Sequence, residues 1–333
     1  MFNHSVCVQE QLISADGVFD FDLAVNPLSV VLICLRPLND TGTLATFQSY
    51  KGVSAAMNRA SILYRGVSIM SMRGEDLAAL NYFRHGIMPY QGQHNDTDND
   101  RRCTVVPMLL GRWPYSKTSI FPASRRGELV LELDLDIADT GYDGLRLSVE
   151  TIEVLDATPQ EYEKKVSLSQ TWAATGDSDF DLPPGNVNRG LLLFGTTPFT
   201  GGSPAPSWGR AKVLLDNVEA GYSATDWETL QMLHCLWGRQ PPMYDGHIHR
   251  FTDAAAGAGT ATTSGPAMVG QGIAGASADL TSWRQYGFLD FDPTGDDGHS
   301  LDTRGKSRFH LRANAETADA VRVTPIEVIS LRG

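Results

Sequence analysis

The tetrapeptide DFDL occupies residues Asp20–Leu23 and recurs, letter for letter, at Asp179–Leu182. Each copy alternates acidic and apolar side chains, which is the period-two pattern of a strand with one face in water. After each copy comes an asparagine and then a continuous apolar run, which is typical of a strand buried on both faces. The repeat predicts that two halves of the chain open with the same pair of strands.

A predicted helix follows in each half. In the first half it covers Asp76–His85, with apolar residues at near-helical spacing and Gly86 as the stop. In the second half, Thr225–Glu228 reads as a capping box, and Gly238 ends the helix. The apolar faces consist of Leu77, Leu80 and Phe83 in the first helix and of Trp227, Leu230, Leu233 and Trp237 in the second.

The two halves also end alike. Arg126-Gly127 precedes a strand pair that finishes in Thr151–Leu155, and Arg304-Gly305 precedes one that finishes in Pro325–Ile329. Chance produces single tetrapeptide repeats, but it seldom produces several matches in one collinear order. The pattern therefore predicts a tandem duplication.

Each copy is of ordinary domain size and consists of short strands punctuated by Gly, Pro, Asn and Asp. With one helix per copy, this predicts an all-β fold of two tandem jelly-roll β-sandwiches, each with a short helix. The first jelly roll is expected at residues 1–160 and the second at 161–333, with a polar linker near 156–170. The Gly/Ala-rich stretch 254–278 is expected to be an insertion in the second copy, forming a long loop.

Composition excludes several classes of protein. The 333 residues carry a net charge of −12, and a field of that sign repels phosphate, which argues against direct binding of nucleic acid. No apolar run reaches the ~18 residues of a transmembrane helix, and the first residues lack a signal-peptide pattern, so we expect synthesis in the cytoplasm. The cysteines have no C-x-x-C spacing and are expected to be free thiols; they are Cys7, Cys34, Cys103 and Cys235.

Motifs for catalysis are weak. The sequence has no G-x-S-x-G elbow and no P-loop. The segment Asp96–Asp100 resembles the start of a calcium loop, but Arg101 and Pro107 stand where an EF-hand needs glycine and glutamate. A solvated loop tip rich in Asp and Asn is the alternative, and calcium binding by this segment stays open.

The sharpest enzymatic motif is His247-Ile248-His249, because an H-x-H pair on a strand directs both imidazoles to one face. With Asp253 and His299 it would give the metal site of a cupin, a jelly-roll enzyme. The spacing to His299 is too long for that family, and a pair of histidines at an exposed strand end or turn explains so short a motif more simply. We therefore predict no catalytic, cofactor-binding or metal site, with these four residues as the alternative metal ligands.

As a whole, the pattern resembles the double jelly-roll major capsid proteins of tailless icosahedral viruses with an internal membrane. The resemblance rests on the two DFDL strands, on the helices at Asp76 and Asp226, and on the closing segment Leu301–Arg304. It implies a non-enzymatic structural protein of the virion, made in the host cytoplasm and binding no cofactor. It also implies homotrimers that tile a shell as pseudo-hexamers and contact neighbouring capsomers. Vertex or penton proteins and an internal viral membrane are the other expected partners, and nucleic acid is not.

Two alternative functions remain from the sequence. One is a receptor- or glycan-binding spike or fibre protein, which would show a glycan-dependent thermal shift. The other is a metal-dependent bicupin enzyme, which would hold one or two transition-metal ions per chain. Stable trimers without metal would favour the capsid protein.

Overall fold

Strands dominate the computed structural model, which describes most of the chain. The described residues are 1–38, 54, 56–87, 90–92, 103–137, 144–196, 207–227, 229, 230, 233, 248–251, 260–263 and 285–331. No helix in these segments is long and apolar enough to cross a lipid bilayer.

The chain folds as two compact units. The first comprises Met1–Asn81, Ile87–Val166 and Ile326–Gly333, and the second comprises Tyr82–Gly86 and Ser167–Pro325. The predicted division is residues 1–160 and 161–333; this grouping instead places residues 161–166 and Ile326–Gly333 in the first unit and Tyr82–Gly86 in the second. The reason is strand β22 (Ala320–Ser330), whose first part pairs with β11 (Leu168–Thr171) and whose last part pairs with β10 (Glu161–Val166).

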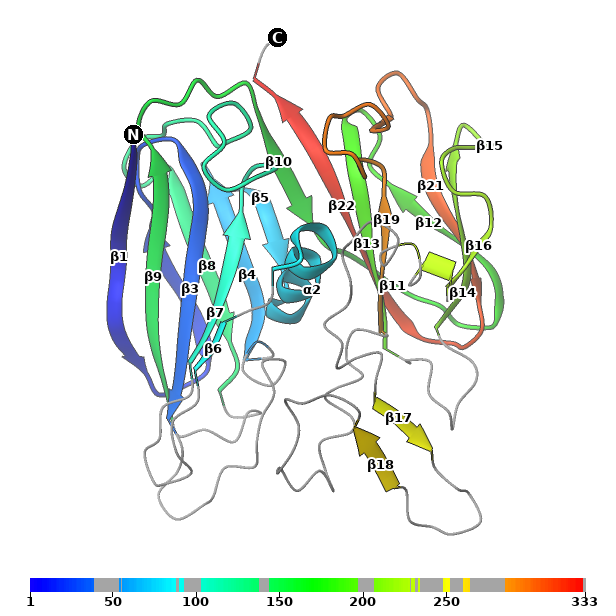
Figure 1. Cartoon of the computed structure of the whole chain (residues 1–333), viewed down its shortest axis with the longest axis horizontal. Helices are drawn as coiled ribbons and strands as arrows, with labels where there is room; N and C mark the ends of the chain where they lie inside the picture. Colours follow the sequence, from blue (N-terminus) through cyan, green and yellow to red (C-terminus); the bar gives the residue numbers. More distant parts are fainter. Residues whose placement is uncertain are drawn as a thin grey trace. The chain divides into compact units, whose positions relative to one another are not determined.

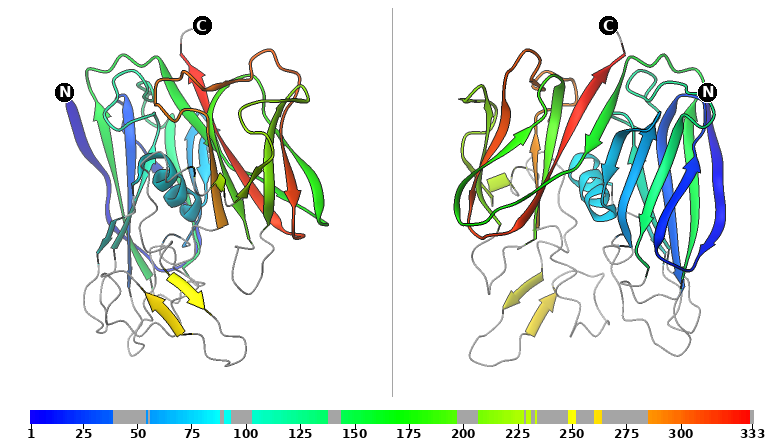
Figure 2. Two further views of the ribbon diagram at one scale, coloured as in Figure 1. Left: turned by 45° about the vertical axis from the view of Figure 1, so that its right-hand side comes forward. Right: turned by 180° about the vertical axis from the view of Figure 1, so that it is seen from behind.

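The first unit is built from two sheets, which form the two layers of a sandwich (Figure 2). One sheet has the order β1-β9-β3-β7, with β6 at its edge, and the other has the order β2-β8-β4-β5, with β10 parallel beside β5 (Figure 1). The strands are β1 (Phe2–Ile13), β2 (Gly17–Asp22), β3 (Leu28–Leu38), β4 (Met57–Tyr64), β5 (Val67–Met72), β6 (Tyr90–Gly92), β7 (Cys103–Leu109), β8 (Leu129–Leu135) and β9 (Gly144–Val154).

The second unit repeats these two sheet orders. Its sheets are β11-β22-β13-β19 and β12-β21-β14-β15. Besides β11 and β22, its main strands are β12 (Gly176–Leu182), β13 (Val187–Gly195), β14 (Trp208–Leu215), β15 (Val218–Glu219), β19 (Tyr286–Asp290) and β21 (Phe309–Ala315). Short additional strands are β16 (Thr225–Asp226), which pairs with β14, β20 (Leu301–Asp302), which pairs with β13, and the pair β17 (Ile248–Phe251) and β18 (Thr260–Thr263).

Eight strands remain in each unit when β6 and β10 are left out of the first and β16, β17, β18 and β20 are left out of the second. Numbered along the chain, these eight strands have the same order in both units: first, eighth, third, sixth in one sheet, and second, seventh, fourth, fifth in the other. This is the strand order of a jelly roll. The two DFDL segments belong to β2 and β12, the second strand of each unit, and the Arg-Gly pairs precede the seventh strand in left-handed turns at Gly127 and Gly305. The predicted fold class is confirmed.

The repeated motif shows how the alternating sequence builds the sandwich. In β12, Phe180 and Leu182 are buried in the core, while Asp179 and Asp181 face outward and are paired with charged side chains of β21 and its preceding turn. Around them the core of the second unit contains Trp172, Trp208 and Trp227, with ring centroids 4.7 Å apart for the first two and 6.0 Å apart for the last two. Burial of such aromatic surface is the main stabilising contribution here.

The predicted helix of the first unit is present after its fifth strand. Helix α2 (Gly74–His85) buries the predicted residues Leu77, Leu80 and Phe83, so this prediction is confirmed. In the second unit Trp227 and Leu230 are helical and almost fully buried in the core, and Leu233 packs against it. The predicted capping position is corrected, because Thr225 and Asp226 pair with β14 as a strand, and Trp237 and Gly238 lie outside the described residues.

Two predicted loops contain strands. The polar linker expected near 156–170 includes β10, in which Glu163 and Lys165 are buried and form an ion pair of 2.9 Å. Each charge neutralises the other, which is why this charged segment is tolerated inside the protein. Within 254–278 the structure describes only Thr260–Thr263, which form β18 and not a loop. Its three threonines are β-branched and favour strands.

Candidate functional site

The candidate metal ligands are not seen together. His247 and Asp253 lie outside the described residues, and for His249 the structure gives its place in β17 and no side-chain position. His299 is exposed in the turn after β19. Across the described part of the chain, no group of three His, Cys, Asp or Glu side chains is arranged to hold a metal ion. The calcium-like segment Asp96–Asp100 also lies outside the described residues.

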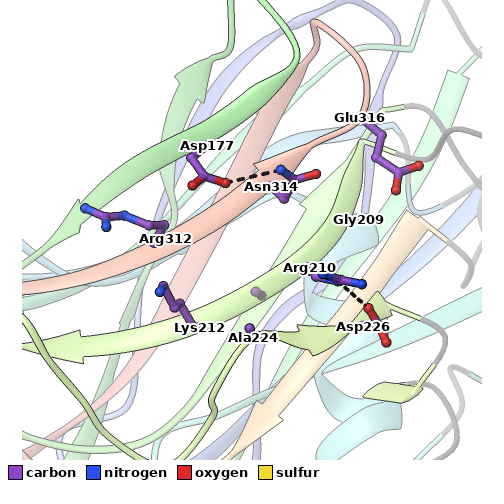
Figure 3. A pocket seen from close by; sticks show the side chains of 10 residues that line it. Asp177, Gly209, Arg210, Lys212, Ala224, Asp226, Arg312, Asn314 and Glu316 are labelled. Carbon is purple, nitrogen blue, oxygen red and sulfur yellow. Dashed lines mark hydrogen bonds and ion pairs between the residues drawn. The ribbon is translucent and has the colours of Figure 1, made fainter.

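A polar hollow of about 450 Å³ lies on the outward face of β12, β21 and β14 (Figure 3). Three of the residues that line it are small, namely Gly209, Ala211 and Ala224. The others carry charged or amide side chains. They are Asp177, Arg210, Lys212, Asp226, Arg312, Asn314 and Glu316.

Most of the charges in the hollow are paired within the protein. Arg210 Nε donates to Asp226 at 2.7 Å, and Asn314 donates to Asp177 at 3.2 Å (Figure 3). Lys212 Nζ donates to Glu219 at 3.3 Å. The ten lining residues include no serine, cysteine or histidine, so the hollow offers neither a hydroxyl or thiol nucleophile nor an imidazole base. Its geometry is that of a charged protein surface.

The aspartates of the second DFDL copy are part of an ion-pair network on the same face. Arg312 donates to Asp179 through Nε at 2.6 Å and through Nη2 at 2.9 Å, and this contact lowers the pKa of Asp179. Arg308 donates to Asp181 at 3.0 Å. In the first copy the arrangement differs, because Asp20 of β2 lies directly opposite Glu132 of β8. The sequence repeat predicts the strands but not the different cross-strand neighbours of their aspartates.

His310 is buried within this network. Its side chain is fully covered, neither ring nitrogen has a hydrogen-bond partner among the described residues, and Nε2 lies 3.9 Å from the carboxylate of Asp179. Burial lowers the pKa of His310, and the nearby guanidinium of Arg308 lowers it further. No sequence pattern marks this histidine, since an isolated His in a strand is usual in any fold.

The first unit exposes apolar side chains at its N-terminal strand. Phe2 is 60% exposed and packs edge-on against Tyr115, which is 50% exposed, with ring centroids 5.2 Å apart. Leu155, 44% exposed, lies beside Met1, to whose carbonyl oxygen its amide donates at 2.9 Å. We name Met1, Phe2, Tyr115 and Leu155 the N-terminal apolar patch. Exposed clusters of this kind commonly mark surfaces that contact another molecule.

Three of the four cysteines are described, and all three are free thiols, as predicted. Cys34 and Cys103 nevertheless lie close together, with their sulfur atoms 3.3 Å apart. This proximity cannot be predicted from the sequence, because it depends on how β3 pairs with β7 and the two residues lack any recognisable spacing.

The repeated strand order defines a double jelly-roll fold, and comparison with solved structures agrees. The chain is similar over its full length to the major capsid protein P2 of bacteriophage PM2, with 10% identity, 100% of each chain covered and a TM-score of 0.62. It also matches the major capsid protein of Sulfolobus turreted icosahedral virus, with 11% identity, 99% and 97% of the two chains covered and a TM-score of 0.68.

A third similar structure is the Faustovirus major capsid protein, with 7% identity, 99% and 90% coverage and a TM-score of 0.54. No protein-family model matches the chain, and no curated protein matches it in sequence. The likeness is therefore one of fold, at sequence identities too low to align individual residues.

Proposed function

We propose that this chain is a viral major capsid protein that forms pseudo-hexameric trimers tiling an icosahedral shell. The observation that supports it best is the jelly-roll strand order, which is repeated in both units and shared with capsid proteins over nearly the whole length of each chain. At these sequence identities the similarity is one of fold, and the capsid role is inferred from that fold.

Duplication gives the proposed role a physical basis. A trimer has three-fold symmetry, and two similar sandwiches per chain give it six similar lobes, so that it fills a hexagonal lattice. Such a tile needs large lateral surfaces that bind other copies. The N-terminal apolar patch and the charged outward face of β12, β21 and β14 supply one apolar and one polar candidate surface.

The proposed role needs no catalysis and no cofactor. The charged hollow and the exposed His299 are compatible with a structural protein. Partners would be neighbouring copies, vertex proteins and an internal viral membrane, in a virion assembled from chains made in the host cytoplasm. The net charge of −12 argues against direct contact with the genome, because electrostatic packing of nucleic acid needs the opposite sign.

Native mass spectrometry of the purified chain tests the assembly unit. The proposal predicts a species with three times the 36.3 kDa mass of one chain, stable without added metal. A second arm adds a panel of glycans and measures the melting temperature. A monomer that is stabilised by a glycan would contradict the capsid role and favour a receptor-binding spike.

A further inference from the structure

Two thiols of the first unit lie in contact on neighbouring strands. Cys34 is in the middle of β3 and Cys103 is at the start of β7, and their sulfur atoms are 3.3 Å apart. The register places Cys34 opposite Val105, so Cys103 is its diagonal neighbour on the same face of the sheet. A disulfide has an S–S distance of about 2.05 Å, so only a small movement separates these thiols from bonding distance.

The thiols lie on the outward face of their sheet. The inward positions of β3 next to Cys34 are Ile33 and Leu35, both fully buried. Cys34 is 6% exposed, whereas Cys103 is partly exposed, so a small reagent in solution reaches Cys103 first. Arg36 is two residues beyond Cys34, on the same face, and its guanidinium also contacts Glu10 at 3.2 Å.

The surroundings of Cys103 favour its thiolate. The hydrogen bond from Cys34 lowers the pKa of Cys103 to about 6, and the positive charge of Arg36 adds to the effect. The same contact holds the pKa of Cys34 above its ordinary value, because Cys34 keeps the shared proton. The pair thus combines one partly exposed thiol that favours its thiolate form with one buried thiol beside it, which is the arrangement of an attacking and a resolving cysteine.

We propose that Cys34 and Cys103 form a reversible disulfide that latches β3 to β7 when the protein meets an oxidising environment. In the reducing cytoplasm the two residues stay as thiols, and outside the cell they close. The latch is a property of the first unit alone and does not depend on assembly into a shell.

With a low-molecular-weight disulfide as the oxidant, the bond forms in two thiol–disulfide exchange steps. The Cys103 thiolate attacks one sulfur of the oxidant, forms a mixed disulfide and releases one thiolate, which takes up a proton. Cys34 then loses its proton to solvent and attacks Sγ of Cys103, which breaks the mixed disulfide and releases the second small thiolate, and this also takes up a proton from solvent. The protein dithiol is oxidised by two electrons and the oxidant is reduced to two thiols.

The bond would tie together two strands that are distant in sequence. Cross-linking residues 34 and 103 closes a long loop in the unfolded chain, and such closure stabilises the folded state. Since diagonal neighbours fit disulfide geometry less well than directly opposed residues, we expect a bond that is easily reduced. We expect the disulfide to raise the melting temperature by about 5 °C or less.

The test is to incubate the folded protein with oxidised glutathione, block the remaining thiols with iodoacetamide and map the peptides by mass spectrometry. We expect Cys34 and Cys103 to be found linked within one chain, with the link removed by dithiothreitol. If both thiols are alkylated, if Cys103 stops as a glutathione adduct, or if the link joins two chains, the proposal is wrong.

Two variants separate the roles of the thiols. Cys34→Ser should leave Cys103 as a persistent glutathione adduct, because the resolving thiol is missing. Cys7→Ser is the matched control and should form the latch as the wild type does, since burial raises the pKa of the Cys7 thiol and it lies on another strand. The mapping of the wild-type protein decides the proposal even if a variant fails to fold.

Discussion

Asp179 on β12 lies directly opposite Arg312 on β21, and the guanidinium donates two hydrogen bonds to its carboxylate, at 2.6 and 2.9 Å. The duplicated residue Asp20 on β2 lies opposite Glu132 on β8. The same residue of the same motif therefore faces a cation in one unit and a like charge in the other. The two units share a fold while their outward faces differ in electrostatics.

This contrast predicts opposite effects of one substitution at the two duplicated positions. Asp20→Lys removes a like-charge pair and places an amine opposite Glu132, which should raise the free energy of unfolding by about 0.2–1 kcal/mol. Asp179→Lys places an amine opposite Arg312 and should lower it by about 1 kcal/mol. Urea unfolding of both variants checks this. Changes of the same sign would show that the two faces are not electrostatically distinct.

Trp227 is expected to be a large contributor to the stability of the second unit. It is 3% exposed, its ring stacks on Trp208, and Gly287 lies so close beneath it that an added Cβ would meet the ring at 2.7 Å. Trp227→Ala leaves a cavity and should cost about 3–5 kcal/mol. Trp113→Ala is the matched control, because that ring is 47% exposed, and it should cost less than about 1 kcal/mol. Similar costs in urea unfolding would contradict the packing described.

His310 is expected to make stability depend on pH. Its folded pKa lies below the unfolded value of about 6.5, so the unfolded state binds more protons as the pH falls. Its contribution is present above the unfolded pKa and is lost as the pH falls toward the folded pKa. The charges around the ring are Asp179 and Asp181 from β12 and Arg308 and Arg312 from its own segment.

The measurement is urea unfolding at a series of pH values between about 7 and 5, the range in which histidine titrates. The His310→Gln variant should lose part of the wild-type decline in stability toward low pH. His299→Gln, at an exposed turn, should retain the whole decline. Parallel profiles for the wild type and His310→Gln would show that another group causes the decline.

The protein is predicted to hold no metal at His247 and His249. Elemental analysis after purification without chelator should find less than stoichiometric iron, manganese, nickel or zinc. A stoichiometric metal that is lost, together with stability, in His249→Ala would favour the bicupin enzyme instead.

The sequence predicts those parts of the fold that follow from local patterns. Alternation in the DFDL motif predicts two outward aspartates and inward apolar neighbours, and Phe180 is buried as that pattern requires. The helical spacing of Leu77, Leu80 and Phe83 likewise predicts a buried helix face, because it is a property of consecutive residues.

Features that depend on pairing between distant strands could not be predicted. In the sequence, Glu163 and Lys165 resemble part of a solvated linker. In the structure they are buried, because β10 pairs with β22, which lies some 160 residues later in the chain. The contact between Cys34 and Cys103 and the opposition of Asp20 and Glu132 likewise follow from strand register, which periodicity alone does not set. A single sequence carries the alternation of each strand but not the identity of its neighbour.

Electron microscopy of the purified protein at high concentration tests whether the chain assembles into pseudo-hexameric trimers. If the two jelly rolls of each chain build a pseudo-hexameric trimer, averaged images will show a three-fold particle with six similar lobes, and these particles will pack side by side into hexagonal tiles or closed shells. Isolated monomers, two-fold dimers or fibres with no hexagonal packing would contradict the account.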